Sequence, residues 1–298
     1  MRLLQAGPAD AAATVLLVHG FGASAEHWRH TLPALAPRLR VLAIDLLGFG
    51  ASDKPDSRLS DEPERPGAVH YCFDLWAEQV LDALRELTPW PPRRPLHLIG
   101  NSIGGMVALT AACRLQQQGI PLSQVVLIDC AQRTLDDKRA AERPWWERSG
   151  RPLLKALVRQ RAVVAPLFRL LAQPAAIRRV LAVAYPSGAN VDAELLELLH
   201  RPSTSPGASE SFRGFVNLFD DHLAPQLLEQ LSRRQPTIPV RLLWGGSDPW
   251  EDPAEARRWA ATFSCIRDLE VLPGLGHCPH DEAPEQVNPI LLRWLQTT

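Results

Sequence analysis

The sequence predicts an α/β protein with a mostly parallel, doubly wound sheet and an inserted helical lid. Short apolar runs recur along the chain, and they are continuously apolar, as in strands buried on both faces. Segments with apolar residues at helical spacing separate these runs, which is typical of strand–helix–strand units. Residues 131–235 break the alternation, because this stretch is helical in pattern and repeatedly interrupted by proline. We therefore expect residues 1–130 and 236–298 to form the core and residues 131–235 to form the lid.

Six apolar runs are the expected strands, and helical patterns follow most of them. The expected strands are residues 14–20, 40–45, 96–100, 124–129, 238–245 and 267–274. The expected core helices are residues 24–36, with Ser24 as N-cap, and residues 72–87, 102–118, 253–263 and 284–296. In a parallel sheet the carboxyl ends of the strands lie at one edge, and that edge is where open α/β sheets bind ligands.

Length and composition restrict the class of protein. The chain has 298 residues, of which 46% are hydrophobic, and this is enough for one large core. A net charge of −1 without long charge blocks gives no sign of nucleic-acid binding. Five scattered cysteines without a CxxC pair indicate reduced thiols. We find no signal peptide and no apolar run of roughly 18 residues, so we expect a soluble, cytoplasmic protein.

The predicted lid has an uneven charge distribution. No Asp or Glu occurs between Glu147 and Asp192. The same span holds basic residues among Leu, Val, Ala and Phe, namely Arg148, Arg151, Lys155, Arg159, Arg161, Arg169, Arg178 and Arg179. A basic amphipathic segment suits an anionic membrane surface, and the alternative is the solvated face of ordinary lid helices. The sequence leaves both open and does not indicate an oligomeric state.

The candidate nucleophile is Ser102, in the stretch Gly100-Asn101-Ser102-Ile103-Gly104. This stretch matches the G-x-S-x-G pattern, in which a tight strand-to-helix turn lifts the serine hydroxyl above the sheet edge. The turn strains the serine backbone and requires small neighbours, which Gly100 and Gly104 supply. The pattern alone is weak, but here it lies between a predicted strand and a predicted helix, which is the structural context that the chemistry needs.

A serine hydroxyl needs a base, and the expected chain order is serine, acid, histidine. Asp248 and His277 follow the last two predicted strands, which places both at the same sheet edge as Ser102. We therefore predict a Ser102–His277–Asp248 triad. Asp129, at the end of the fourth predicted strand, is a competing acid, and His280 is a competing base.

Two backbone N–H groups are needed to stabilise the negatively charged oxygen of a tetrahedral intermediate. We expect Ile103, directly after the nucleophile, to supply one of them. Phe21, in the loop after the first strand, is the expected second donor, because Gly20 and Gly22 let that loop fold back. His19 in the same stretch is interpreted as a structural residue.

Other polar clusters are interpreted as structural. A metal site made of His277, Cys278, His280 and Asp281 is disfavoured, because ligands packed so closely in sequence rarely reach one ion. Cys130 and Cys278 lack a strained turn and are expected to be buried thiols. The glycine-rich stretch 45–55 matches neither common phosphate-binding pattern and is expected to be a turn beside the site. No metal or organic cofactor is expected.

Together these stretches resemble the α/β-hydrolase superfamily over nearly the whole chain. The markers are "VHGFG", "DLLGFGASDKP", "GNSIGG", "WGGSDPW" and "GLGHCPHDE". "GNSIGG", "WGGSDPW" and "GHCPHDEAPEQVN" are similar to the pheophytinase and chlorophyll dephytylase group of photosynthetic organisms, in its cyanobacterial-type form. The resemblance implies an α/β-hydrolase fold, hydrolysis of the phytyl ester of chlorophyll a or pheophytin a, and peripheral contact with the thylakoid membrane.

The superfamily usually has an antiparallel hairpin before its first parallel strand. Only about a dozen residues precede residue 14, so we expect this hairpin to be shortened or absent. Trp145, Trp146 and Phe168 in the lid, with Trp28 and Trp250 outside it, are the candidate substrate-binding residues. Two other functions stay open: a serine hydrolase for a lipid ester or a carbon–carbon bond, and a non-catalytic ligand receptor.

Overall fold

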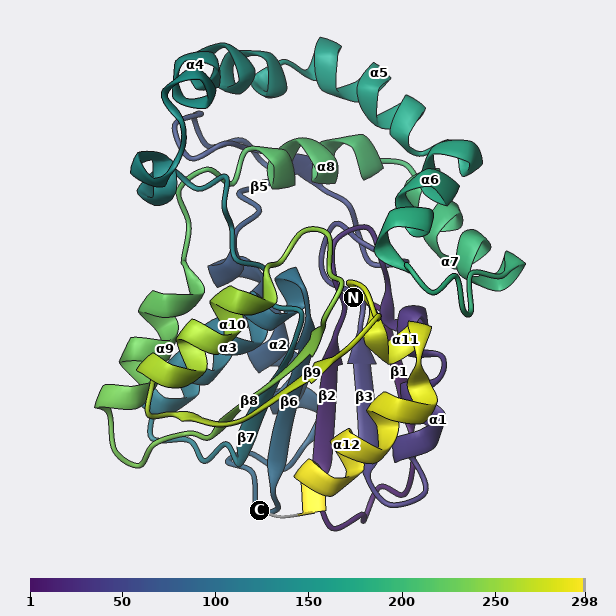
Figure 1. Ribbon diagram of the computed structural model, residues 1–298, viewed down its shortest axis with the longest axis vertical. Helices are drawn as coiled ribbons and strands as arrows, with labels where there is room; N and C mark the ends of the chain where they lie inside the picture. The colour runs from purple at the N-terminus through teal and green to yellow at the C-terminus, as the bar shows by residue number, and fades with distance from the viewer. Residues whose placement is uncertain (297–298) are drawn as a thin grey trace.

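The computed structural model describes residues 1–296, and a seven-stranded sheet lies at its centre (Figure 1). The strands stand in the order β1-β3-β2-β6-β7-β8-β9. They are β1 (Leu3–Ala6), β2 (Thr14–Val18), β3 (Arg40–Ile44), β6 (Leu96–Asn101), β7 (Gln124–Ile128), β8 (Val240–Gly245) and β9 (Ile266–Leu272). Only β1 is antiparallel to its neighbour, whereas the other described pairs in this sheet are parallel. The predicted α/β fold with a mostly parallel sheet is confirmed.

Strand β1 is the part of the sheet that the sequence analysis missed. It pairs with β3 in a register that runs from Leu3 opposite Ile44 to Ala6 opposite Val41. One antiparallel strand therefore precedes the first parallel strand. Its four residues are half-buried or exposed, so they carry no apolar run that would reveal a strand. A second, two-stranded sheet pairs β4 (Asp56–Ser57) with β5 (Ala68–Val69).

Helices cover both faces of the sheet. One face packs against α2 (Phe73–Leu87), α3 (Ile103–Gln117), α9 (Ala224–Arg233) and α10 (Pro253–Thr262), and the other against the 3-10 helix η1 (Ala25–Trp28), α1 (Thr31–Leu35) and α12 (Pro284–Gln296). Strand β2 shows why its sequence is continuously apolar. Leu16 and Val18 belong to the first core cluster, whereas Val15 and Leu17 belong to the second.

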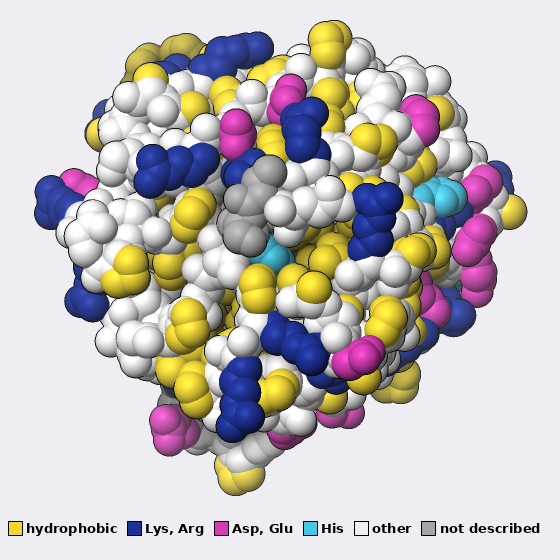
Figure 2. Space-filling view, turned by 90° about the horizontal axis from the view of Figure 1, so that it is seen from below, with side chains coloured by type: hydrophobic (Ala, Val, Ile, Leu, Met, Phe, Trp, Pro, Cys, Tyr) yellow, Lys and Arg dark blue, Asp and Glu magenta, His cyan; other side chains and the backbone are white. Residues whose placement is uncertain are grey.

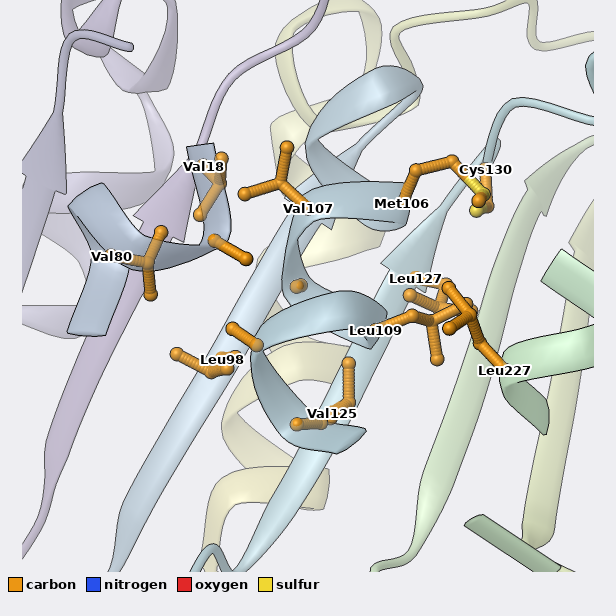
Figure 3. Close-up of a cluster of buried hydrophobic side chains, with 14 of the residues drawn as sticks. Val18, Val80, Leu98, Met106, Val107, Leu109, Val125, Leu127, Cys130 and Leu227 are labelled. Atoms are coloured by element: carbon orange, nitrogen blue, oxygen red, sulfur yellow. The ribbon is translucent and has the colours of Figure 1, made fainter. Parts of the chain in front are cut away.

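The larger core cluster is centred on α3 (Figure 3). Leu109 of this helix lies beside Leu127 of β7 and Leu227 of α9, and Met106 lies beside Cys130. These side chains are fully buried or nearly so. Helix α3 therefore packs against the sheet and against its neighbours α2 and α9, which fixes the position of its N-terminal end.

The predicted helix 24–36 is two short helices instead. Asp45, at the end of β3, accepts a hydrogen bond from the backbone N–H of Ala25 at 2.6 Å. The Ser24 side chain makes no capping bond. A buried carboxylate from the sheet edge thus takes the role expected of Ser24. Helix η1 ends at Trp28, and α1 begins at Thr31.

The inserted helices lie over the carboxyl edge of the sheet (Figure 1). They are the 3-10 helix η2 (Asp137–Glu142), α4 (Trp145–Arg159), α5 (Arg161–Leu171), α6 (Pro174–Ala184), α7 (Ala193–Ser203) and α8 (Ala208–Val216), and we call α4–α8 the cap helices. The predicted lid boundary at residue 235 is wrong, because α9 packs against α3 and buries Leu227, Leu228 and Leu231 in the core. We place the end of the insertion before Ala224.

Candidate active site

Ser102 lies in a strained turn between β6 and α3. Its φ of 55° and ψ of −122° are values that L-residues rarely adopt. The flanking glycines are required by close packing. A Cβ on Gly100 would lie 2.1 Å from the carbonyl oxygen of Gly104, and a Cβ on Gly104 would lie 2.3 Å from that of Val18. The sequence pattern therefore has a steric cause, and it holds the serine at the carboxyl edge of the sheet.

Asp248 and His277 stand in the loops after β8 and β9, at the same edge. His277 Nδ1 and Asp248 Oδ2 are 2.8 Å apart, and the Asp248 side chain has no exposed surface. The other carboxylate oxygen of Asp248 accepts the backbone N–H groups of Trp250 at 2.9 Å and Glu251 at 3.2 Å. With Nδ1–H donating to the carboxylate, Nε2 is the nitrogen of His277 that can accept a proton.

The surroundings of Asp248 keep it ionised. Burial alone raises the pKa of this carboxyl group. The hydrogen bond and charge of His277 and the N–H of Trp250 act in the opposite direction and outweigh burial, so the pKa of Asp248 lies below its usual value. An ionised Asp248 orients the His277 ring and stabilises its protonated form.

Ser102 and His277 line one cavity. The neighbour of the serine reaches the histidine loop directly, because Asn101 Nδ2 donates to the carbonyl oxygen of His277 at 3.1 Å. No hydrogen bond joins Ser102 Oγ to the His277 ring within residues 1–296. In serine hydrolases this bond is often long and becomes short only in the complex with substrate.

Phe21 and Ile103 also line the cavity. Within the described part of the chain, neither residue donates its backbone N–H to a protein acceptor. The loop of Phe21 comes close to the nucleophile, because a Cβ on Gly20 would lie 3.2 Å from Ser102 Cβ. The Phe21 ring stacks on Phe215 with a centroid distance of 4.1 Å, which fixes the loop. Two free N–H groups beside a serine are the arrangement of an oxyanion hole.

The competing acid and base occupy other positions. Asp129 is fully buried and accepts the N–H of Gly245 at 2.8 Å. Burial and the charge of Asp248 raise the pKa of Asp129 well above its usual value, so it is the neutral member of the two carboxyl groups. His280 is also buried, between His27 and Trp28 at centroid distances of 4.8 and 4.3 Å, and does not line the cavity.

His19 is held by backbone groups on both sides of its ring. Its Nε2 accepts the N–H of Leu46 at 3.0 Å, which leaves Nδ1–H to donate to the carbonyl oxygen of Gly20 at 2.7 Å. The ring therefore connects the loops after β2 and β3. Among residues 1–296, no three His, Cys, Asp or Glu side chains gather closely enough to hold a metal ion. Burial raises the pKa of both Cys130 and Cys278 well above the usual value for a thiol.

The cavity has a volume of about 640 Å³ and mostly apolar walls. The core contributes Trp250, whose ring meets His277 edge-on at a centroid distance of 4.8 Å. The cap helices contribute Leu154, Val158, Val180, Leu181, Ala184, Leu199, Phe215 and Val216. The basic residue among the lining residues is Arg133, and it is paired with Asp136. The cavity thus suits a large, apolar molecule without a net charge.

The other predicted substrate-binding residues lie elsewhere. Trp28 is fully buried in the core cluster behind the sheet, so its prediction is wrong. Trp145 and Trp146 do not line the cavity, and they are 72% and 61% exposed on α4. Phe168 packs against Phe212 at a centroid distance of 5.2 Å, between α5 and α8.

A buried acidic pair connects the histidine loop to the insertion, and the sequence analysis missed its role. Glu282, in α11 (Pro279–Glu282), accepts the N–H of Gly276 at 2.7 Å with one oxygen. Its other oxygen accepts the N–H and hydroxyl of Ser187 at 2.9 and 2.6 Å. Asp281 accepts Arg29 Nε at 2.8 Å and the hydroxyl of Tyr185 at 3.0 Å. Two consecutive carboxylates, four and five residues after a candidate catalytic histidine, were the available signal.

We expect Glu282→Gln to lower both stability and turnover. The amide can accept on one side only, so its NH₂ group would face either Gly276 N–H or the two donors of Ser187. An unsatisfied buried group of this kind costs about 2 kcal/mol of unfolding free energy. Urea unfolding and the kcat of the same variant check this. The matched control is Glu285→Gln on the exposed surface of α12, and equal effects in both variants would contradict the role of Glu282 in connecting the histidine loop to the insertion.

Glu251 predicts a pH dependence of stability. Burial raises its pKa to about 8 from the usual value of 4.5, and the nearby Asp248 acts in the same direction. Between these two pH values the folded state holds a proton that the unfolded state releases, so stability falls as pH rises, by up to about 1.4 kcal/mol per pH unit. We expect Glu251→Gln to remove this loss. Denaturant unfolding at several pH values tests this prediction. It is contradicted if the unfolding free energy falls equally with pH in the unchanged protein and in Glu251→Gln.

A strand–serine–helix turn, an acid and a histidine after the last two strands, and a cap over the carboxyl edge of a parallel sheet define the α/β-hydrolase class. The chain belongs to the Alpha/beta hydrolase family, whose model matches residues 15–290.

The chain is similar to hydrolases with different names. The chain is 27% identical to the chloroplastic pheophytinase of Arabidopsis thaliana, over 96% of this chain and 61% of that protein. It is 29% identical to the 2-hydroxymuconate semialdehyde hydrolase of a Pseudomonas species, over 66% of this chain and 56% of that protein. The chain thus spans about three fifths of these relatives. A probable hydrolytic enzyme from Pseudomonas aeruginosa superimposes with a TM-score of 0.72 at 24% identity, covering 99% of this chain and 89% of that one.

Proposed function

We propose that this enzyme is a serine esterase that cleaves the phytyl ester of chlorophyll a or pheophytin a. The products are phytol and chlorophyllide or pheophorbide. The observation that carries the proposal is the position of Ser102 and the His277–Asp248 pair in a cavity of about 640 Å³ with mostly apolar walls. The similarity to a pheophytinase supports the choice of pigment ester.

The proposed reaction runs through an acyl-enzyme. His277 Nε2 takes the proton of Ser102 Oγ, and Oγ attacks the ester carbonyl carbon. The N–H groups of Phe21 and Ile103 donate to the oxygen that becomes negatively charged. The bond to the phytyl oxygen breaks, and that oxygen takes the proton from His277. Water then gives a proton to His277 and attacks the acyl carbon. Ser102 regains its proton, and the carboxylic acid product leaves.

The cavity lining favours a neutral ester over a small anionic substrate. A carboxylate in an apolar cavity needs a free cation, and the basic residue among the lining residues, Arg133, is already paired with Asp136. Arg133 also donates to the carbonyl oxygen of Leu218 at 2.8 Å and stacks over Phe73 at 4.9 Å. Its guanidinium group is thus engaged on several sides, whereas a long hydrocarbon chain needs only the apolar walls.

Incubation of the purified protein with chlorophyll a and with pheophytin a, followed by chromatography of the products, tests the proposal. We expect chlorophyllide or pheophorbide to appear together with an equal amount of phytol. Short nitrophenyl esters serve as the comparison. If they are hydrolysed while both pigments stay intact, the enzyme acts on another ester.

A second candidate is a serine hydrolase for a different lipid ester or for a carbon–carbon bond. The likeness to a 2-hydroxymuconate semialdehyde hydrolase favours the carbon–carbon reaction. A ligand receptor with the same fold is a third. A fluorophosphonate probe separates it from both enzymes, because only a reactive Ser102 becomes labelled.

A further inference from the structure

The outer surface of the cap helices exposes many large apolar side chains. Sixteen large hydrophobic residues are exposed in the described part of the chain, and eleven of them lie on α4, α5 and α6. Leu153 and Leu170 have the largest exposed fractions among the aliphatic ones, 67% and 66%. Exposed apolar residues scattered singly need no explanation, but such a concentration on three consecutive helices does.

Helix α5 packs one side against α8 and leaves other side chains exposed. Helix α5 packs against α8 through the side of Phe168, which contacts Phe212. Val163, Leu167 and Leu170 follow one another at helical spacing and are exposed. In Figure 1, α4 and α5 form the layer farthest from the sheet, with α8 beneath them. We call this outer surface the apolar cap face, formed by Trp146, Leu153, Leu157, Val163, Leu167 and Leu170.

The same helices carry many basic side chains and almost no acidic ones. The span 148–191 contains eight basic residues and no Asp or Glu. Four of the eight form ion pairs with acids from outside the span, namely Arg151 and Lys155 with Asp137, Arg159 with Asp61 and Arg161 with Glu210. The other four, Arg148, Arg169, Arg178 and Arg179, have no carboxylate partner among the described residues. The opposite end of the molecule shows Lys, Arg, Asp and Glu side chains of both signs interspersed (Figure 2).

The cavity reaches this surface. Leu154 of α4 and Val180 of α6 line the cavity, and they are also 45% and 50% exposed. The rim between the two helices is therefore apolar on both sides.

We propose that the apolar cap face binds to the surface of an anionic lipid bilayer. Its Trp, Leu and Val side chains enter the boundary between headgroups and acyl chains, and the uncompensated arginines contact lipid phosphates. This orientation directs the rim of Leu154 and Val180 toward the lipid, so that an apolar ester enters the cavity from the bilayer. The binding of the bilayer stands on its own, whereas the entry of an ester rests on the proposed function.

Flotation with vesicles tests the binding. We expect the full chain to float with vesicles of phosphatidylcholine and phosphatidylglycerol, and to float less with phosphatidylcholine alone. Raising the salt from about 0.05 M to about 0.5 M weakens binding to the anionic vesicles, because exposed charges are screened. Leu153→Glu combined with Leu170→Glu is expected to reduce the bound fraction about tenfold or more. Arg178→Gln combined with Arg179→Gln reduces it several-fold.

Matched variants place the same charge changes elsewhere. Gln118→Glu with Gln235→Glu, and Arg257→Gln with Arg267→Gln, alter exposed positions of the core and should bind like the unchanged protein. Hydrolysis of a short soluble ester reports separately on the active site, and the two cap variants should retain it. Equal binding of cap and control variants overturns the proposal, as does a stable dimer that Leu153→Glu with Leu170→Glu converts to monomers.

Discussion

Replacing Ser102 with alanine is expected to abolish hydrolysis, with kcat falling by about 10⁶. The serine supplies the atom that forms the acyl bond, and the neighbouring groups cannot replace it. Cys130 packs beside Gly105 of α3 and Cys278 follows His277 directly in sequence, but burial holds the pKa of both thiols well above the usual value, so neither forms a thiolate at neutral pH. Single-turnover and steady-state assays with the preferred ester measure the loss.

The alanine variant should retain the fold. Alanine keeps the Cβ that already stands in the strained turn at φ 55°, and it removes one hydroxyl group from a residue with 7% exposure. Its urea midpoint should therefore stay close to that of the unchanged protein. Ser123→Ala, just before β7 and at the other edge of the sheet, is the matched control and should keep full activity. Near-normal activity in Ser102→Ala would refute the assignment of the nucleophile.

The sequence predicted the parallel strands well, because a strand that is buried on both faces appears in the sequence as a continuous apolar run. Alternate side chains of β2, β3, β6, β7 and β8 enter different core clusters, so most residues of these strands are apolar. Strand β1 lies at the edge of the sheet and is only half-buried or exposed, so it has no such apolar run. The helix after Ser24 does begin where it was predicted, with Ser24 as its N-cap residue, but the Ser24 side chain does not accept the capping hydrogen bond. The capping acceptor, Asp45, comes from a distant part of the chain and is brought there by β3.

Two further predictions failed, because the pattern of apolar residues in a sequence does not specify which partner a helix or side chain packs against. Helix α9 is amphipathic like the cap helices, but its apolar side packs against α3, and so it belongs to the core. Trp28 lies close in sequence to the loop of the candidate oxyanion hole, yet its ring turns into the core cluster behind the sheet. The glycines at 100 and 104 were informative, in contrast, because backbone contacts within about 2 Å of their missing Cβ atoms allow no other residue.

Asp248→Asn is expected to lower kcat by about 10⁴ while leaving the fold intact. An ionised Asp248 accepts Nδ1–H of His277 at 2.8 Å and so leaves Nε2 unprotonated toward the cavity. An asparagine can present its NH₂ group to Nδ1 instead. The ring would then carry its proton on Nε2 and could not take the proton of Ser102. The kcat of Asp248→Asn at pH values from about 6 to 9 measures this, because the loss should persist over the whole range.

Asp129 provides the control that separates the two acids. Its pKa is raised by burial and by the charge of Asp248, and it bonds the N–H of Gly245. A neutral carboxyl group and an asparagine side chain have nearly the same shape, and both can accept the N–H of Gly245 with a carbonyl oxygen. Asp129→Asn should therefore keep kcat within about threefold. In the Asp248→Asn variant the neighbouring charge is gone, and the pKa of Asp129 is expected to fall. Activity does not return, because the ring of His277 stays oriented by residue 248. If Asp129→Asn proved the more damaging change, the acid of this site would be Asp129.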